Sequence, residues 1–157
     1  MDKVLLDTSF CIRLLKSNDP FHQNAVDYYQ YFLSENIEMY LSTIVVSEYS
    51  VKDDPDNLLD LQSFKILPFD YHDAKLAGQF YSIIMPARVS LGQQRGVVIN
   101  DCKLIAQLSN RNFDAYVTKD RSSKKDIVDK IDARHKLNFK FIDIAQPLVN
   151  YLGQLPF

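Results

Sequence analysis

Hydrophobic residues follow two alternating patterns along the chain, namely short continuous runs and longer stretches with helical spacing. The first run, Val4-Leu5-Leu6 within residues 3–7, is typical of a strand buried on both faces. Similar segments predict strands at residues 38–42, 64–69, 115–118 and 140–144. Because helical patterns separate these segments, the sequence predicts an α/β fold with a central parallel β-sheet flanked by helices.

Capping residues indicate where some of the helices begin. Thr8 and Ser9 offer hydroxyl caps for a short helix over residues 8–15. Asp70, with Asp73 three residues later, forms an acidic version of the capping box ahead of a long helix. These signals support the order of strands and helices that the hydrophobic pattern predicts.

A second predicted helix opens at Pro20. The spacing places Tyr28 and Tyr31 away from its apolar side, as surface residues or as part of a protein interface. The apolar side comprises Val26, Tyr29, Phe32 and Leu33.

Residues 86–96 are the least regular part of the chain, and the following helix is predicted to run from about residue 100 to 112. The sequence assigns no role to the segment 86–99.

The composition fits a single domain over residues 1–157, with 46% hydrophobic and 24% charged residues. No stretch approaches the roughly 18 consecutive apolar residues of a membrane span, and the beginning of the chain lacks the pattern of a signal peptide. Cys11 and Cys102 form no CxxC pair, and the histidines have no metal-ligand spacing. We therefore expect a cytoplasmic protein without a membrane partner.

Two acidic residues follow predicted strands. Asp7 lies where the first strand ends, and Asp120 comes two residues after Thr118 at the end of the fourth. In an open parallel sheet, ligands bind beyond the carboxyl ends of the strands. An ordinary turn or cap explains either residue alone, so only their occurrence together with further acids indicates a site.

Two more carboxylates lie on apolar helix faces. Glu48 shares a face with Ile44 and Val45, and Asp101 leads an apolar face of a later helix. The helix dipole is an alternative explanation for Asp101, but not for Glu48 in mid-helix. A carboxylate on an apolar face requires a partner, because burying it unpaired is unfavourable.

A divalent cation would neutralise all four carboxylates together. Oxygen ligands suit Mg²⁺ or Mn²⁺, which activate water and stabilise charge on a phosphodiester. No lysine or arginine lies within three residues of Asp7 or Glu48, and partners from distant segments are invisible in a sequence. The residues therefore predict a metal site. The net charge of −2 neither supports nor excludes a nuclease.

The ordered motifs resemble the PIN-domain nucleases, most of all the bacterial VapC-type toxins. They are Asp7-Thr8-Ser9 after an apolar strand, Glu48 in the next βα unit, Asn100-Asp101 opening a helix, and Thr118-Lys119-Asp120 after a strand. Their order and approximate spacing match over nearly the whole chain. The resemblance implies a three-layer fold with the acids gathered at one end of the sheet.

The same resemblance implies an endoribonuclease that depends on Mg²⁺ or Mn²⁺ and cleaves RNA. Related toxins form homodimers and are silenced by an antitoxin protein. The residues that would bind metal and act in catalysis are Asp7, Glu48, Asp101 and Asp120, with Thr8, Ser9 and Thr118 in support.

The chain departs from the family pattern after Asp120. Many relatives carry a further acid and an aromatic residue there, whereas this chain reads Arg121-Ser122-Ser123-Lys124-Lys125, which weakens the case for a second metal ion. Lys119, Arg121, Lys124 and Lys125 are candidates to contact the RNA backbone. A solvated charged loop explains these four residues equally well.

Two other classes of protein fit less of the sequence. A haloacid-dehalogenase-type phosphatase needs a second aspartate two residues after Asp7, where this chain has Ser9. A response-regulator receiver needs paired acids near the first strand. The principal alternative is a PIN-like module that binds RNA or protein without catalysis.

Overall fold

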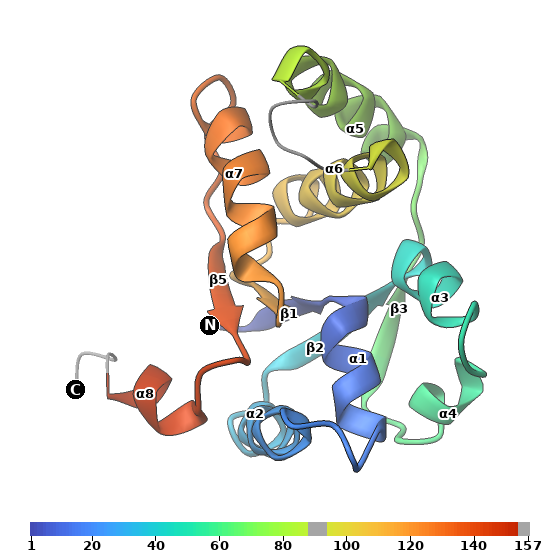
Figure 1. Ribbon diagram of the computed structural model, residues 1–157, viewed down its shortest axis with the longest axis vertical. Coiled ribbons are helices and arrows are strands. Elements are labelled where there is room, and N and C mark those ends of the chain that lie inside the picture. Colours follow the sequence, from blue (N-terminus) through green and yellow to red (C-terminus); the bar gives the residue numbers. More distant parts are fainter. Residues whose placement is uncertain (88–93, 154–157) are drawn as a thin grey trace.

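Five short strands form one parallel sheet at the centre of the computed structural model, which describes residues 1–87 and 94–153 (Figure 1). The strands are β1 (Lys3–Leu6), β2 (Glu38–Ser42), β3 (Phe64–Leu67), β4 (Ala115–Thr118) and β5 (Lys140–Asp143). Their order is β3-β2-β1-β4-β5, and every neighbouring pair is parallel. The strand order reverses between β1 and β4, which is the position where open parallel sheets bind ligands.

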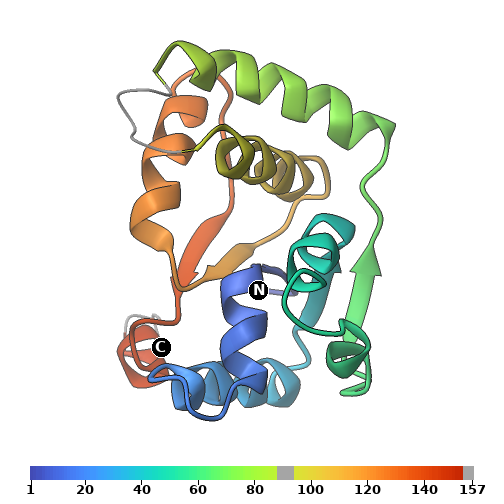
Figure 2. The same ribbon diagram turned by 45° about the vertical axis from the view of Figure 1, so that its right-hand side comes forward.

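Helices lie on both sides of the sheet, α1 and α2 on one side and α5, α6 and α7 on the other (Figures 1 and 2). The helices are α1 (Thr8–Leu15), α2 (His22–Ser34), α3 (Thr43–Tyr49), α4 (Asp56–Leu59), α5 (Tyr71–Ile84), α6 (Arg95–Asn110), α7 (Arg121–Asp132) and α8 (Leu148–Leu152). A 3₁₀ turn spans Met85–Ala87. The predicted three-layer α/β fold is thereby confirmed. None of the helices in the described ranges is long and apolar enough to cross a membrane.

The first apolar run occupies the middle of the sheet. Val4, Leu5 and Leu6 are all 0% exposed, as expected for a strand that helices cover on both faces. Phe10 of α1 and Phe32 of α2 belong to the core cluster around β1. A second cluster joins apolar residues of α5, α6 and α7. The segment that precedes Asp7 is therefore held rigidly from both sides.

Helix α2 differs from the sequence prediction in its start and in its buried face. It begins two residues after Pro20 instead of at that residue. Tyr28 is 1% exposed, whereas Leu33, predicted for the apolar side, is 47% exposed. Tyr28 is buried because its ring packs near Phe32 and near Tyr151 of α8, a helix that the hydrophobic pattern did not predict.

Other segments also differ from the prediction. Helix α6 begins at Arg95, five residues before the predicted start, and residues 88–93 of the irregular segment lie outside the described part. The charged segment after Asp120 is helix α7 instead of a solvated loop. Such polar helices escape prediction because few of their residues are apolar.

Candidate active site

Asp7 stands at the point where the strand order reverses. Its backbone N–H donates to the carbonyl of Val117 in β4 at 2.9 Å, so the residue is tied to the neighbouring strand. Asp7 occupies the N-cap position of α1, but its side chain makes no capping hydrogen bond. The prediction that Thr8 and Ser9 cap this helix is therefore wrong, because both lie inside α1 and their hydroxyls contact acidic side chains.

Three hydroxyl groups donate to the carboxylate of Asp7. Ser9 Oγ and Thr118 Oγ1 lie 2.6 and 2.9 Å from Oδ2, and Tyr116 OH lies 2.8 Å from Oδ1. The residue is 4% exposed. Sequence reasoning missed Tyr116, because a tyrosine within an apolar strand segment does not reveal where its hydroxyl points. The three donors fix the orientation of this carboxylate.

Glu48 reaches the same end of the sheet from α3. Its carboxylate accepts hydrogen bonds from Thr8 Oγ1 and from Asn100 Nδ2, the latter at 2.9 Å. Asn100 precedes Asp101 in α6, so this contact ties α3 to the helix that carries the next acid.

Asp101 is paired with a lysine from α7. Lys124 Nζ lies 2.6 Å from Asp101 Oδ1 and 3.6 Å from Asp7 Oδ1. Asp101 is 5% exposed and Lys124 is 7% exposed, so the contact is shielded from water. We call Asp7, Glu48 and Asp101 the acid cluster. Lys124 is its internal counter-ion, a role that sequence reasoning missed.

The helical spacing of α7 contains the signal for this burial. Lys124 precedes Ile127 by three residues and Ile131 by seven, and the three residues are buried together. A lysine on the apolar face of a helix calls for a partner in the same way as Glu48 does.

The pKa values follow from these contacts. Burial raises the pKa of Asp7, but Lys124 and the three hydroxyl donors outweigh it, so the net pKa lies below the ordinary value. Burial lowers the pKa of Lys124, yet the three carboxylates outweigh it and hold the net value above the ordinary one. Burial keeps the pKa of Asp101 raised although Lys124 opposes it, and Asp7 and Glu48 add to the rise. The ammonium thus remains charged among acids that repel one another.

The carboxylate of Asp120 does not join this group. Its side chain is 46% exposed, and Oδ1 lies 3.6 Å from Lys119 Nζ. The backbone N–H of Asp120 donates to Thr118 Oγ1 at 3.0 Å, so its main chain is linked to the cluster. The structure thus brings together three of the four predicted acids and leaves the fourth carboxylate at the surface.

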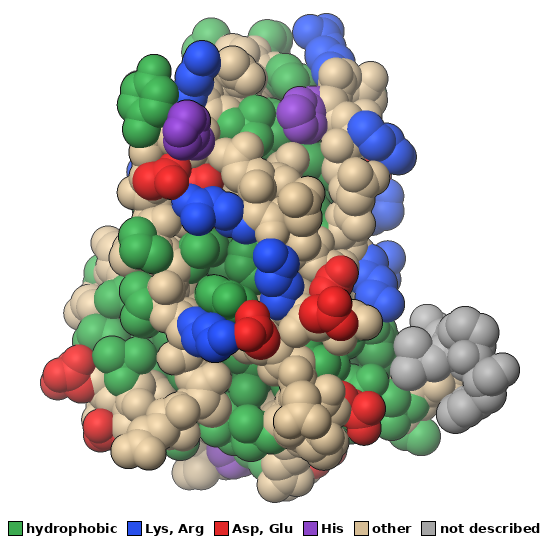
Figure 3. Space-filling model, turned by 180° about the vertical axis from the view of Figure 1, so that it is seen from behind, with side chains coloured by type: hydrophobic (Ala, Val, Ile, Leu, Met, Phe, Trp, Pro, Cys, Tyr) green, Lys and Arg blue, Asp and Glu red, His purple; other side chains and the backbone are tan. Residues whose placement is uncertain are grey.

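The four basic residues predicted to contact RNA occupy two environments. Lys119, Arg121 and Lys125 are wholly or partly exposed around the start of α7. Lys124 is buried against the acid cluster and is not available to a phosphate at the surface. On the face opposite to that of Figure 1, charges of both signs are interspersed, without a broad basic area (Figure 3).

The oxygen donors of the acid cluster suit a hard cation in kind. However, no set of three or more Asp, Glu, His or Cys side chains in residues 1–87 and 94–153 is arranged to hold a metal ion. In addition, the ammonium of Lys124 lies within 3.6 Å of both Asp7 and Asp101. These carboxylates do not fit a divalent ion between them while Lys124 stays in this position.

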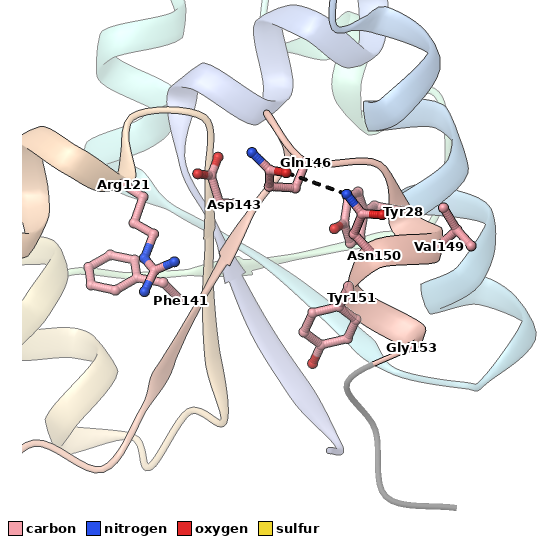
Figure 4. A pocket seen from close by; sticks show the side chains of 9 residues that line it. All are labelled: Tyr28, Arg121, Phe141, Asp143, Gln146, Val149, Asn150, Tyr151 and Gly153. Atoms are coloured by element: carbon pink, nitrogen blue, oxygen red, sulfur yellow. Dashed lines mark hydrogen bonds between the residues drawn. The ribbon is translucent and has the colours of Figure 1, made fainter.

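A hollow of about 470 Å³ lies between β5, α8 and the start of α7, and its lining contains no member of the acid cluster. Figure 4 shows Arg121 at one side of this hollow and Asn150 and Tyr151 of α8 at the other. The ring of Phe141 in its wall lies 6.0 Å from the ring of Tyr116, which donates to Asp7. The hollow is lined by Tyr28, Arg121, Phe141, Asp143, Gln146, Val149, Asn150, Tyr151 and Gly153. Aromatic rings and side-chain amides of this kind stack on and hydrogen-bond to nucleobases.

Comparisons with known proteins agree with this architecture. The PIN domain family model matches residues 4–126, and the chain belongs to this family. No curated protein matches the chain at a significant level.

Three solved structures share the fold. A DNA-bound VapBC structure from Salmonella typhimurium matches with a TM-score of 0.60 at 19% identity, over 92% of this chain and 99% of that chain. A VapBC2 structure from Rickettsia felis, bound to a promoter DNA fragment, matches with a TM-score of 0.60 at 17% identity. The match covers 90% of this chain and 99% of that chain. A VapBC-1 structure from nontypeable Haemophilus influenzae matches with a TM-score of 0.57 at 14% identity. The match covers 92% of this chain and 99% of that chain.

Proposed function

We propose that this PIN-domain chain is an endoribonuclease that hydrolyses RNA phosphodiester bonds with Mg²⁺ or Mn²⁺, and that it is the toxin of a toxin–antitoxin pair. The observation that carries the proposal is the convergence of Asp7, Glu48 and Asp101 from three separate elements at the carboxyl ends of the strands. Mutually repelling buried carboxylates are unfavourable for stability, which is why such groupings are typical of functional sites.

The residues suggest a division of roles. Asp7 is fixed by its hydroxyl donors, while Asp101 or Asp120 would orient the water that attacks the phosphorus in line. The products would carry a 5′-phosphate and a 3′-hydroxyl. Asp7, Glu48 and Asp101 would hold a Mg²⁺ or Mn²⁺ ion, and Asp120 would join them only after its exposed side chain turns toward the cluster. The ion would neutralise developing charge and acidify water. Such an ion and the ammonium of Lys124 exclude each other from the space between Asp7 and Asp101.

RNA and an antitoxin are the proposed partners. The hollow of Figure 4 offers stacking surfaces and amides to a base, and Arg121 in its lining would contact a phosphate. Lys119 and Lys125, near the start of α7, are proposed as further phosphate contacts. The shared fold with chains of VapBC complexes supports an antitoxin partner. A homodimer is proposed from the family resemblance, and a cytoplasmic location from the sequence patterns described above.

The position of Lys124 between two acids supports a second candidate function, that of a module that binds RNA or protein without catalysis. Because the acid cluster already contains a cation, it is neutralised in part without any metal. This candidate predicts that RNA binding is the same with and without a chelator and that no RNA is cut.

The test is cleavage of a panel of single-stranded and transfer RNAs with Mg²⁺, with Mn²⁺ or with chelator. Glu48→Gln and Asp120→Asn are compared with Asp126→Asn, an exposed acid on α7 that serves as the matched control. We expect metal-dependent cutting that falls about a hundredfold or more in the first two variants and stays unchanged in the control. Binding without cutting by the folded wild type would favour the non-catalytic module.

A further inference from the structure

Lys124 occupies the space between two carboxylates on which the proposed function depends. Its Nζ lies 2.6 Å from Asp101 Oδ1 and 3.6 Å from Asp7 Oδ1, and its side chain is 9% exposed. Mg²⁺ binds carboxylate oxygens at about 2.0–2.1 Å in nearly ideal octahedral geometry. An ammonium that contacts the same oxygens stands where such an ion and its water ligands would lie.

The fold holds this lysine in place. Lys124 shares the buried face of α7 with Ile127 and Ile131, which belong to the second core cluster. Its Nζ also lies 5.6 Å from the centre of the Tyr116 ring. The contact with the acids is therefore built into the packing of α7, and the ammonium is carried on a flexible four-carbon stem.

We propose that Lys124 is a tethered cation that neutralises the Asp7–Asp101 pair in the metal-free protein, and that a divalent ion enters only in exchange for its ammonium. This inference deepens the proposed function and rests on it. It assigns Lys124 a part in setting the metal affinity of the site instead of contacting RNA.

The exchange weakens metal binding by a calculable factor. A ligand that binds only one conformation has its apparent affinity reduced by the fraction of molecules in that conformation. If the withdrawn conformation of Lys124 is populated at about 1–10%, the wild type binds metal roughly ten- to a hundredfold more weakly than a protein without this ammonium.

The first experiment follows the reactivity of Lys124 in the wild-type protein. Amines are acetylated in the presence of chelator or of Mn²⁺, bound Mn²⁺ is counted by electron paramagnetic resonance, and modified lysines are mapped by mass spectrometry. With chelator we expect Lys124 to be protected and Lys125, with a 51% exposed side chain, to react. With Mn²⁺ bound, Lys124 should become reactive while Lys125 stays unchanged. Protection that persists in the Mn²⁺-loaded protein would overturn the exchange.

The second experiment measures Mn²⁺ affinity without RNA. Lys124→Met should bind Mn²⁺ about ten- to a hundredfold more tightly than the wild type, and Lys125→Met should bind like the wild type. Equal affinity in the wild type and Lys124→Met, or no binding by either, would refute the proposal. If Lys124→Met is unfolded in chelator but folds when Mn²⁺ is added, the exchange is supported. If the variant folds neither in chelator nor with Mn²⁺, the acetylation experiment on the wild-type protein decides.

These measurements separate the inference from the nuclease proposal, because neither needs RNA or cleavage. Mn²⁺ exchange in a protein that never cuts RNA would retain the inference and reject the nuclease. Cleavage that proceeds equally in chelator would reject the exchange as a step required for activity.

Discussion

Replacing Lys124 by methionine is expected to destabilise the metal-free protein strongly. Methionine keeps most of the hydrocarbon stem near the Tyr116 ring but removes the charge. Asp7 and Asp101, at 4% and 5% exposure, then remain buried close together without the cation that pairs with both. The substitution thus isolates the electrostatic contribution of the lysine from its packing.

The expected magnitude follows from this burial. Breaking a buried ion pair by removing one partner costs about 3–5 kcal/mol. In a chain of 157 residues each kcal/mol lowers the melting temperature by roughly 2–4 °C. The melting temperature should therefore fall by roughly 6–20 °C. Against a typical domain stability of about 5–15 kcal/mol, this is a large fraction of the total.

Thermal unfolding followed by circular dichroism in chelator at neutral pH measures the effect. Lys125→Met is the matched control, because its exposed pair with Asp129 contributes no more than about 0.5 kcal/mol. Adding Asp101→Asn to Lys124→Met should recover about 1–2 kcal/mol, because it removes one of the unpaired charges. Melting of Lys124→Met within about 2 °C of the wild type would refute the view of Lys124 as a required counter-ion.

Three further predictions concern other contacts. Lys124 and the hydroxyl donors hold the pKa of Asp7 below its ordinary value of 3.8, so the stability that this carboxylate contributes should be lost as the pH falls below about 4. In urea unfolding, Asp7→Asn should not show this loss of stability at low pH. Asp73→Ala should lower the free energy of unfolding by about 3 kcal/mol, since this 0% exposed carboxylate completes the capping box of α5 and pairs with Arg111 at 3.1 Å. A loss under about 1 kcal/mol in urea unfolding would contradict this. Replacing the exposed Gln146 and Asn150 together by alanine should weaken the binding of single-stranded RNA in chelator about tenfold, as measured by fluorescence anisotropy. Unchanged affinity would exclude the hollow as a binding site for a base.

Helix α7 illustrates why part of the site escaped prediction. Its sequence is mostly charged, so the hydrophobic pattern alone favoured a solvated loop. Once the helix is known, the spacing of Lys124, Ile127 and Ile131 places the lysine on the buried side. The choice between a surface cation and an internal one thus depended on recognising a helix with few apolar residues.

The sequence by itself determined where the strands lie and which strands are followed by acidic residues. Continuous apolar segments such as Val4-Leu5-Leu6 form strands buried on both faces, and Asp7 follows the first strand directly. These are local properties, because a strand and the residue after it depend on neighbours in the chain.

Only the tertiary structure decided how the acids are neutralised. Tyr116 and Thr118 donate to Asp7 from 109 and 111 residues away, and Lys124 meets Asp101 from 23 residues away. Such pairs depend on the order of β1 beside β4 and on the packing of α7 against α6, which no local pattern encodes. A carboxylate's need for a partner is therefore readable from the sequence, but whether that partner is a metal ion or a lysine is settled by packing between distant segments.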